Sequence, residues 1–117
     1  MNAVEFLLDN GANVNTKTNK NFTLLMYCAK YGDMDLIKMV VKYGASINDV
    51  DLLGFSALDY AVQREHFEAV EFLVENGATI TDNSYMIAVE NNLKKIVYYF
   101  DTLDPNKEVF LKKSRVF

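Results

Sequence analysis

Four groups of side chains in this 117-residue chain are of types that carry chemistry in other proteins. His66 is not accompanied by a nucleophile and a base in an arrangement typical of catalysis. We therefore expect it to make a cap or turn contact. Asp49 and Asp51 share one turn but lack the remaining ligands of a calcium loop. Cys28 lies in an apolar segment, where a buried and unreactive thiol is expected. The glutamates recur at helical spacing and indicate a solvated helix face: Glu65, Glu68, Glu71 and Glu75. We therefore expect no enzyme, no cofactor and no metal site.

Composition excludes several further classes of protein. Apolar residues make up 50% and charged residues 24%, as in ordinary folded domains. No apolar run approaches the roughly 18 residues of a membrane span, and the single cysteine cannot build a disulfide framework or a Cys-based zinc site. The formal net charge is −4, and most of the acidic excess lies before residue 94. Because an acidic body repels phosphate, we expect no nucleic-acid partner and no membrane contact. The basic residues after 93 are interpreted as a solvated face.

Three Gly-Ala pairs stand at one fixed spacing of 33 residues. They are Gly11-Ala12, Gly44-Ala45 and Gly77-Ala78, in the contexts LLDNGANVN, VVKYGASIN and LVENGATIT. Residues 22–25 align with residues 55–58 at the same period. Self-similarity at a period of this length indicates a repeat protein.

Each repeat carries two amphipathic helix patterns. The first helix is expected to start after a cap, Thr23 or Ser56, and to bury small residues that let neighbouring helices approach. The second helix has apolar residues at i, i+1, i+4 and i+5, which share one helical stripe: Leu36, Ile37, Val40 and Val41, with equivalents one period earlier and later. A glycine follows each second helix, where positive φ is needed. Residues 51–54, DLLG, predict a tight turn between repeats.

A 33-residue period of helix, turn, helix and projecting turn resembles the ankyrin repeat, over about residues 1–100. The segments NKNFTLLMYCAKYGDMDLIKMVVKYGASIN and DLLGFSALDYAVQREHFEAVEFLVENGATIT follow the family pattern. The resemblance implies an all-α ankyrin-repeat solenoid of stacked helix-turn-helix units with projecting turns or β-hairpins. We expect a partial repeat (1–18), repeats 19–50 and 51–81, a divergent capping repeat (82–104) and a C-terminal helix or tail (105–117).

The chain departs from the family pattern at the start of the first helix and in the middle of one repeat. Leu24 and Ala57 replace the family proline, and Met26 and Asp59 replace the family histidine. Glu65 stands where the family has a glycine. We expect these changes to weaken the helix start, to remove the hydrogen bond of the histidine, and so to loosen the array.

The resemblance also implies a function, namely binding of another protein through turn tips and the concave first-helix face, without catalysis. The family's variable contact positions correspond here to Asn19, Lys20, Phe22, Lys30, Tyr31, Leu52, Leu53, Phe55, Gln63 and Arg64. The two leucines stand at a turn tip with little core to enter, which favours partner contact. Tyr31, Gln63 and Arg64 are expected to face outward.

Two aromatic pairs repeat at the same period. For Phe22 and Phe55 two interpretations stay open: contact with a partner, or packing between adjacent turns. Tyr27 and Tyr60 align beside the small buried residues, and we expect both to pack between helices.

A second hypothesis is a self-associating structural unit, or a fragment of a longer ankyrin protein such as a regulatory or host-directed effector. The chain opens inside a second helix, so Val4 and Leu7 are expected to be uncovered and to allow a homo-oligomer. Phe110, Val116 and Phe117 of the tail could serve the same purpose. One cysteine fits an intracellular, cytoplasmic protein or an effector acting in a host cell.

Overall fold

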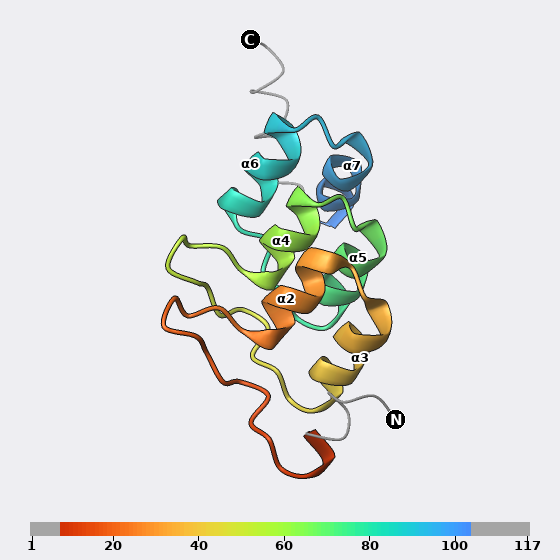
Figure 1. The fold of residues 1–117 in the computed structure, drawn as a ribbon. Helices are drawn as coiled ribbons and strands as arrows, with labels where there is room; N and C mark the ends of the chain where they lie inside the picture. The colour runs from red at the N-terminus through yellow and green to blue at the C-terminus, as the bar shows by residue number, and fades with distance from the viewer. Residues whose placement is uncertain (1–7, 104–117) are drawn as a thin grey trace.

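The computed structural model describes residues 8–103. Six complete helices in this range form three helix-turn-helix pairs: α2 (Leu24–Tyr31) with α3 (Met34–Lys42), α4 (Ala57–Gln63) with α5 (Phe67–Glu75), and α6 (Asp82–Glu90) with α7 (Lys94–Leu103). The first helices α2, α4 and α6 stack in one column, and α3, α5 and α7 form a second column beside it (Figure 1). The arrangement is the helical repeat solenoid that the 33-residue period predicts.

The expected caps fix where the first helices begin. The Thr23 side chain accepts a hydrogen bond from the backbone N–H of Met26 at 3.2 Å, and Ser56 accepts one from Asp59 at 3.2 Å. Thr81 caps α6 in the same way through the N–H of Ser84 at 3.1 Å. Each cap satisfies an N–H group that the helix itself leaves without a partner.

Small residues let the stacked helices approach closely. Cys28, Ala29, Ala61 and Ala88 are fully buried on the facing sides of α2, α4 and α6. Burial, followed by the nearby negative charge of Asp33, raises the pKa of the Cys28 thiol to about 11. The thiol is therefore protonated at neutral pH and buried, as the sequence predicts.

Two turns project from the helix columns and are called fingers below. Finger 1 comprises residues 17–23 and is closed by an antiparallel bridge between Lys17 and Thr23; finger 2 comprises residues 50–56 and is closed between Val50 and Ser56. Both leave the column of first helices on the same side (Figure 1). The backbone N–H of Leu52 donates to the carbonyl of Lys20 at 3.0 Å, which joins the two fingers.

Asparagine side chains tie each finger base to the next repeat. Asn15 donates to the carbonyl of Gly44 at 3.2 Å and accepts from the N–H of Ser46 at 2.7 Å. One period later, Asn48 donates to Gly77 at 3.0 Å and accepts from Thr79 at 2.8 Å. This role is not among the sequence predictions, although the spacing of 33 residues between the two asparagines is a signal for it.

The expected loss of a hydrogen bond at Asp59 is wrong. Asp59 is buried and accepts from the N–H of Ser56 at 3.0 Å, which completes the capping box. Its carboxylate also accepts from Ser84 Oγ at 2.6 Å and Asn83 Nδ2 at 3.1 Å, both at the start of α6. A carboxylate has about four lone-pair sites, so one side chain serves both its own helix and the next repeat. At the equivalent position, Met26 Sδ accepts only a weak bond from the N–H of Thr23.

The substituted glycine position has a strained backbone. Glu65 has φ 60°, in the left-handed region where the equivalent Gly32 has φ 69°. A side chain there places its Cβ against the following carbonyl oxygen. Gly32 itself has no room for a side chain, because an added Cβ would lie 2.6 Å from His66 Nδ1.

Several sequence predictions lie outside the described residues. These are the uncovered Val4 and Leu7, the C-terminal helix or tail over 105–117, and the apolar tail residues Phe110, Val116 and Phe117. Within residues 8–103, no helix combines the length and apolar character that crossing a membrane requires.

Replacing Glu65 with glycine should stabilise the protein by about 1 kcal/mol, because the strain of positive φ is removed. Urea denaturation followed by circular dichroism measures the change. Glu68→Gly is the matched control. Because Glu68 is an exposed residue of α5, this substitution should lower the free energy of unfolding by about 1 kcal/mol. Equal losses in both variants would contradict the assignment of strain to residue 65.

Replacing Asp59 with alanine should destabilise the protein by about 2–4 kcal/mol. The change removes the cap bond to Ser56 and leaves the buried hydroxyl of Ser84 without its acceptor. The same denaturation experiment measures the effect. Asp33→Ala removes a comparable cap bond at an exposed helix start and should cost only about 1 kcal/mol. Similar costs for the two variants would show that the bond between repeats contributes nothing.

Candidate partner-binding surface

A tyrosine ring held between two phenylalanines anchors the fingers to the helices. The Tyr60 ring lies 5.6 Å from the Phe22 ring of finger 1 and 5.3 Å from the Phe55 ring of finger 2, measured between centroids. Its hydroxyl donates to the carboxylate of Asp51. Aromatic pairs at such distances stabilise a protein by more than the burial of their apolar surface alone would. Tyr60 of α4 therefore fixes both fingers relative to the column of first helices.

The local structure of each finger depends on one side-chain acceptor at its base. In finger 2, Asp51 Oδ1 accepts from the N–H groups of Leu53 at 2.9 Å and Phe55 at 3.0 Å. In finger 1, Thr18 Oγ1 accepts from those of Lys20 at 3.2 Å and Phe22 at 3.1 Å. Thr18 and Asp51 stand one period apart. Only the aspartate has a second oxygen, and that oxygen binds Tyr60.

The surroundings of the Tyr60 hydroxyl favour its protonated form. Burial, then the hydrogen bond to Asp51 and the negative charges of Asp51 and Asp59, raise the pKa of Tyr60 to about 12 from an ordinary value of 10. The hydroxyl therefore remains a hydrogen-bond donor across the physiological pH range.

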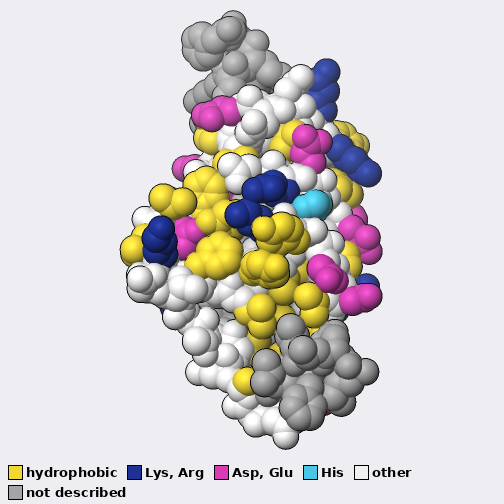
Figure 2. Space-filling model, viewed as in Figure 1, with side chains coloured by type: hydrophobic (Ala, Val, Ile, Leu, Met, Phe, Trp, Pro, Cys, Tyr) yellow, Lys and Arg dark blue, Asp and Glu magenta, His cyan; other side chains and the backbone are white. Residues whose placement is uncertain are grey.

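A cleft of about 590 Å³ opens between the two fingers. It is lined by Thr18, Asn19, Lys20, Phe22, Asp51, Leu52, Leu53 and Tyr60. Leu52 and Leu53 form its outer rim and are 67% and 78% exposed. The space-filling view shows an apolar patch over the fingers and over α2 and α4 (Figure 2).

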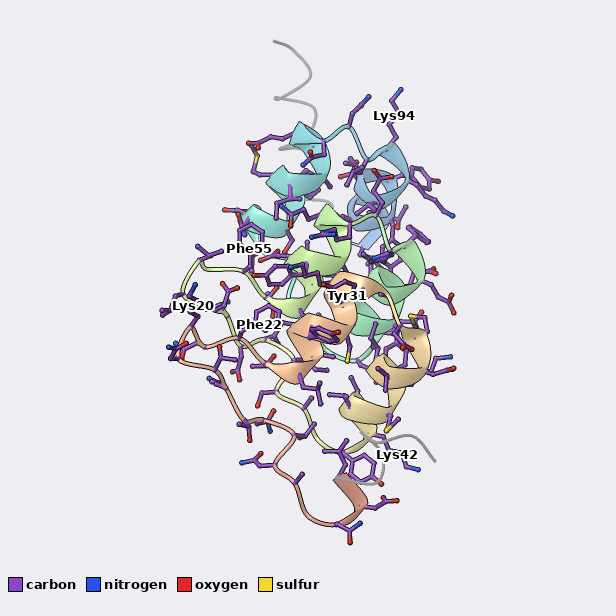
Figure 3. The ribbon with its side chains drawn as sticks, viewed as in Figure 1. Lys20, Phe22, Tyr31, Lys42, Phe55 and Lys94 are labelled. Atoms are coloured by element: carbon purple, nitrogen blue, oxygen red, sulfur yellow. The ribbon has the colours of Figure 1, made fainter. Side chains whose placement is uncertain are left out.

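The structure brings together five of the ten predicted contact residues around this cleft: Asn19, Lys20, Phe22, Leu52 and Leu53. The other five are Phe55, which supports Tyr60 from the second finger, Lys30 and Tyr31 at the end of α2, and Gln63 and Arg64 at the end of α4. Tyr31, Gln63 and Arg64 face outward, as predicted. Lys20, Phe22, Phe55 and Tyr31 lie on the same side of the molecule (Figure 3).

Both interpretations for Phe22 and Phe55 stay open, although both rings pack within the protein, on Tyr60 of α4. Each is half-buried and contacts Tyr60. Phe22 also forms part of the cleft wall, so a role in packing and a role in shaping the surface coincide there.

The expectation that both tyrosines pack between helices is wrong for Tyr27, whereas Tyr60 is buried and its ring packs on the phenylalanines of the two fingers. Tyr27 is 50% exposed and its ring lies 4.8 Å from that of Tyr31 on the same helix. Two partners that hold Tyr60 are missing at this position. Thr18 replaces the aspartate, and within residues 8–103 no finger precedes finger 1 to supply a second phenylalanine.

The residues considered for catalysis or metal binding have structural roles. Asp49 pairs with Lys17 at 3.4 Å, and Asp51 organises finger 2. A His66 ring nitrogen, Nε2, lies 3.1 Å from the carbonyl of Lys30, so His66 makes the expected turn contact and also covers Gly32. No cluster of three or more metal-ligating side chains occurs in the part of the chain that the structure describes.

Sequence comparison agrees with this architecture. A family model described as ankyrin repeats (3 copies) matches residues 1–84. The chain therefore belongs to the ankyrin repeat family, as its sequence pattern indicates. Ankyrin repeats are generally protein–protein interaction modules, and the family is typically non-catalytic. A search among curated proteins found no match.

Replacing Tyr60 with phenylalanine should remove a proton-release step near pH 12. Because the folded pKa lies above the ordinary value, the unfolded chain releases this proton first as the pH rises. The contribution of Tyr60 to stability is therefore complete below pH 10 and is lost between about pH 10 and 12. The free energy of unfolding should fall less steeply in Tyr60→Phe than in the wild type over this window.

Urea denaturation at a series of pH values measures both slopes. Tyr99, whose pKa is also raised by burial and by Glu75 and Glu71, is present in both proteins, so its contribution cancels in the comparison. Parallel declines in the two proteins would contradict a raised pKa at Tyr60.

Proposed function

We propose that the chain is a protein-binding module whose contact surface is the finger face, defined as the two fingers with the exposed ends of α2 and α4. The observation that carries this proposal is the pair of exposed leucines, Leu52 and Leu53, on the rim of the apolar cleft. The fold buries only a minor part of each of these side chains. Complete burial by a partner would contribute at most about 1.5–3 kcal/mol for each leucine.

The rigidity of the fingers supports this function. The leucines stand on a finger whose backbone is held by Asp51 and whose base is packed on Tyr60. The N–H of Leu52 is also bonded to finger 1. A surface organised before binding loses less conformational entropy when the partner docks. Tyr31 and Arg64, both exposed at the ends of α2 and α4, are of residue types that often dominate binding energy.

Self-association is a second candidate, favoured by the aromatic face of α2. Tyr27 and Tyr31 are 50% and 59% exposed, whereas the equivalent Tyr60 is covered by the preceding finger. A second copy that covered this face would bury both rings. Sedimentation equilibrium over a range of concentrations tests this candidate, which predicts a mass that rises above 13.4 kDa.

Selection from a random peptide library displayed on phage tests the protein-binding proposal. Peptides should be enriched on the wild-type chain, and their binding should fall by at least about tenfold on the Leu52→Ser/Leu53→Ser variant. The direct readout is fluorescence anisotropy of a labelled synthetic copy of the most enriched peptide.

The matched control is Tyr98→Ser/Leu103→Ser, which removes two exposed apolar side chains from α7 instead. Circular dichroism melting confirms that both double variants fold. Enrichment that is equal on the wild type and the leucine variant would reject the finger face as the contact surface.

A further inference from the structure

We infer that the finger face takes an acidic peptide segment that carries a large apolar side chain. The apolar side chain enters the cleft between the fingers, and the flanking carboxylates contact Lys20, Lys30 and Arg64. This inference rests on the proposed function and specifies the chemistry of the partner.

Three cations, Lys20, Lys30 and Arg64, belong to the finger face. Lys20 lines the cleft on finger 1. Lys30 lies in the last turn of α2, with its ammonium 5.9 Å from the centre of the exposed Tyr31 ring. Arg64 follows Tyr31 by one period and is exposed at the end of α4. Lys17 is paired with Asp49 and is not counted among these cations.

Two carboxylates of the same elements, Asp51 and Asp59, are buried and hydrogen-bonded within the protein, so little of either is displayed at the surface. Asp51 is buried, and its two oxygens accept from two backbone N–H groups and from Tyr60. Asp59 is also buried, and its carboxylate accepts hydrogen bonds from Ser56 and from two side chains at the start of α6. Glu65 is exposed next to Arg64, beyond the end of α4. The displayed charges of the finger face are thus mainly cationic, on a chain whose net charge is −4.

The surface view shows the same separation of charge. Dark blue side chains lie beside the apolar patch over the fingers and first helices, where one magenta group is also visible, while most other magenta ones lie over α3, α5 and α6 (Figure 2). Opposite potentials on two surfaces accelerate their encounter and disfavour partners of the wrong sign. An acidic segment is therefore attracted to the finger face and repelled by much of the remaining surface.

The cleft itself requires an apolar anchor. Phe22, Leu52 and Leu53 supply its walls and rim, and Tyr60 is its aromatic floor. A volume of about 590 Å³ is within the range of pockets that enclose small ligands. It therefore has room for a leucine or an aromatic side chain of a peptide.

A nucleic acid would meet the same cations but fits the cleft less well. Single-stranded nucleic acids bind where aromatic side chains stack on successive bases along a positively charged groove. Here the rim of the cleft is made of two leucines, which offer no ring for stacking, and the exposed rings of Tyr27 and Tyr31 are not among the residues that line the cleft. The observations thus favour a peptide.

Peptides selected on the wild-type chain provide the first test. Aspartate and glutamate should be enriched, relative to the starting library, within a few positions of a leucine or aromatic residue. A labelled peptide of this kind should then bind about tenfold more weakly to each of Lys20→Glu, Lys30→Glu and Arg64→Glu. Added salt should weaken its binding to the wild type.

The matched controls are Lys38→Glu and Lys42→Glu, which make the same change in net charge on α3. Lys42 lies on the part of the molecule remote from Lys20 (Figure 3). These controls should bind the peptide as the wild type does. An equal loss in the controls would show a general charge effect and would overturn the inference.

The remaining outcomes separate this inference from the proposed function. Selected peptides that are neutral or basic, yet depend on Leu52 and Leu53, would overturn the acidic partner and leave the finger face as the contact surface. Selection without dependence on the two leucines would reject both. Binding of a labelled oligothymidylate that is tighter than that of the peptide, and lost in Lys20→Glu, would replace the peptide with a nucleic acid.

Discussion

Close stacking of the first helices is the constraint on which the rest of the structure depends. A single helix pair cannot bury its own apolar face, so each repeat requires a neighbour. The fully buried Cys28, Ala29, Ala61 and Ala88 are small enough for α2, α4 and α6 to pack at short range. This spacing also brings finger 1 and finger 2 within hydrogen-bonding distance of each other. The surface proposed for partner binding exists only because these helices lie so close together.

Polar side chains then fix the order of the stack, which apolar contacts alone do not specify. Asn15 and Asn48 each bond the backbone of the following repeat, and Asp59 accepts from two side chains of the repeat after its own. Hydrogen bonds are directional, so they select one register between neighbouring helix pairs. The chain thereby replaces the hydrogen bond of the family histidine with a carboxylate that binds forward along the array.

Tyr60 links this framework to the proposed function. Its ring packs on both fingers and its hydroxyl holds Asp51, the residue that shapes the finger displaying Leu52 and Leu53. The residues that build the cleft and those that would contact a partner therefore belong to one connected cluster. Under the proposed function, substitutions at the exposed leucines and cations would change the preferred partner while the support beneath them remains.

The sequence alone determined the repeat, the helix pairs, their caps and the side that carries the fingers, because these follow from a 33-residue period and from local chemistry at Thr23, Ser56, Gly44 and Gly77. It also predicted that Leu52 and Leu53 are exposed, since a turn tip has no core to enter. Only the tertiary structure decided that Tyr27 is exposed while the aligned Tyr60 is buried, and that Asp59 bonds the next repeat. Burial of a ring, or satisfaction of a carboxylate, depends on groups that residues distant in sequence bring to it.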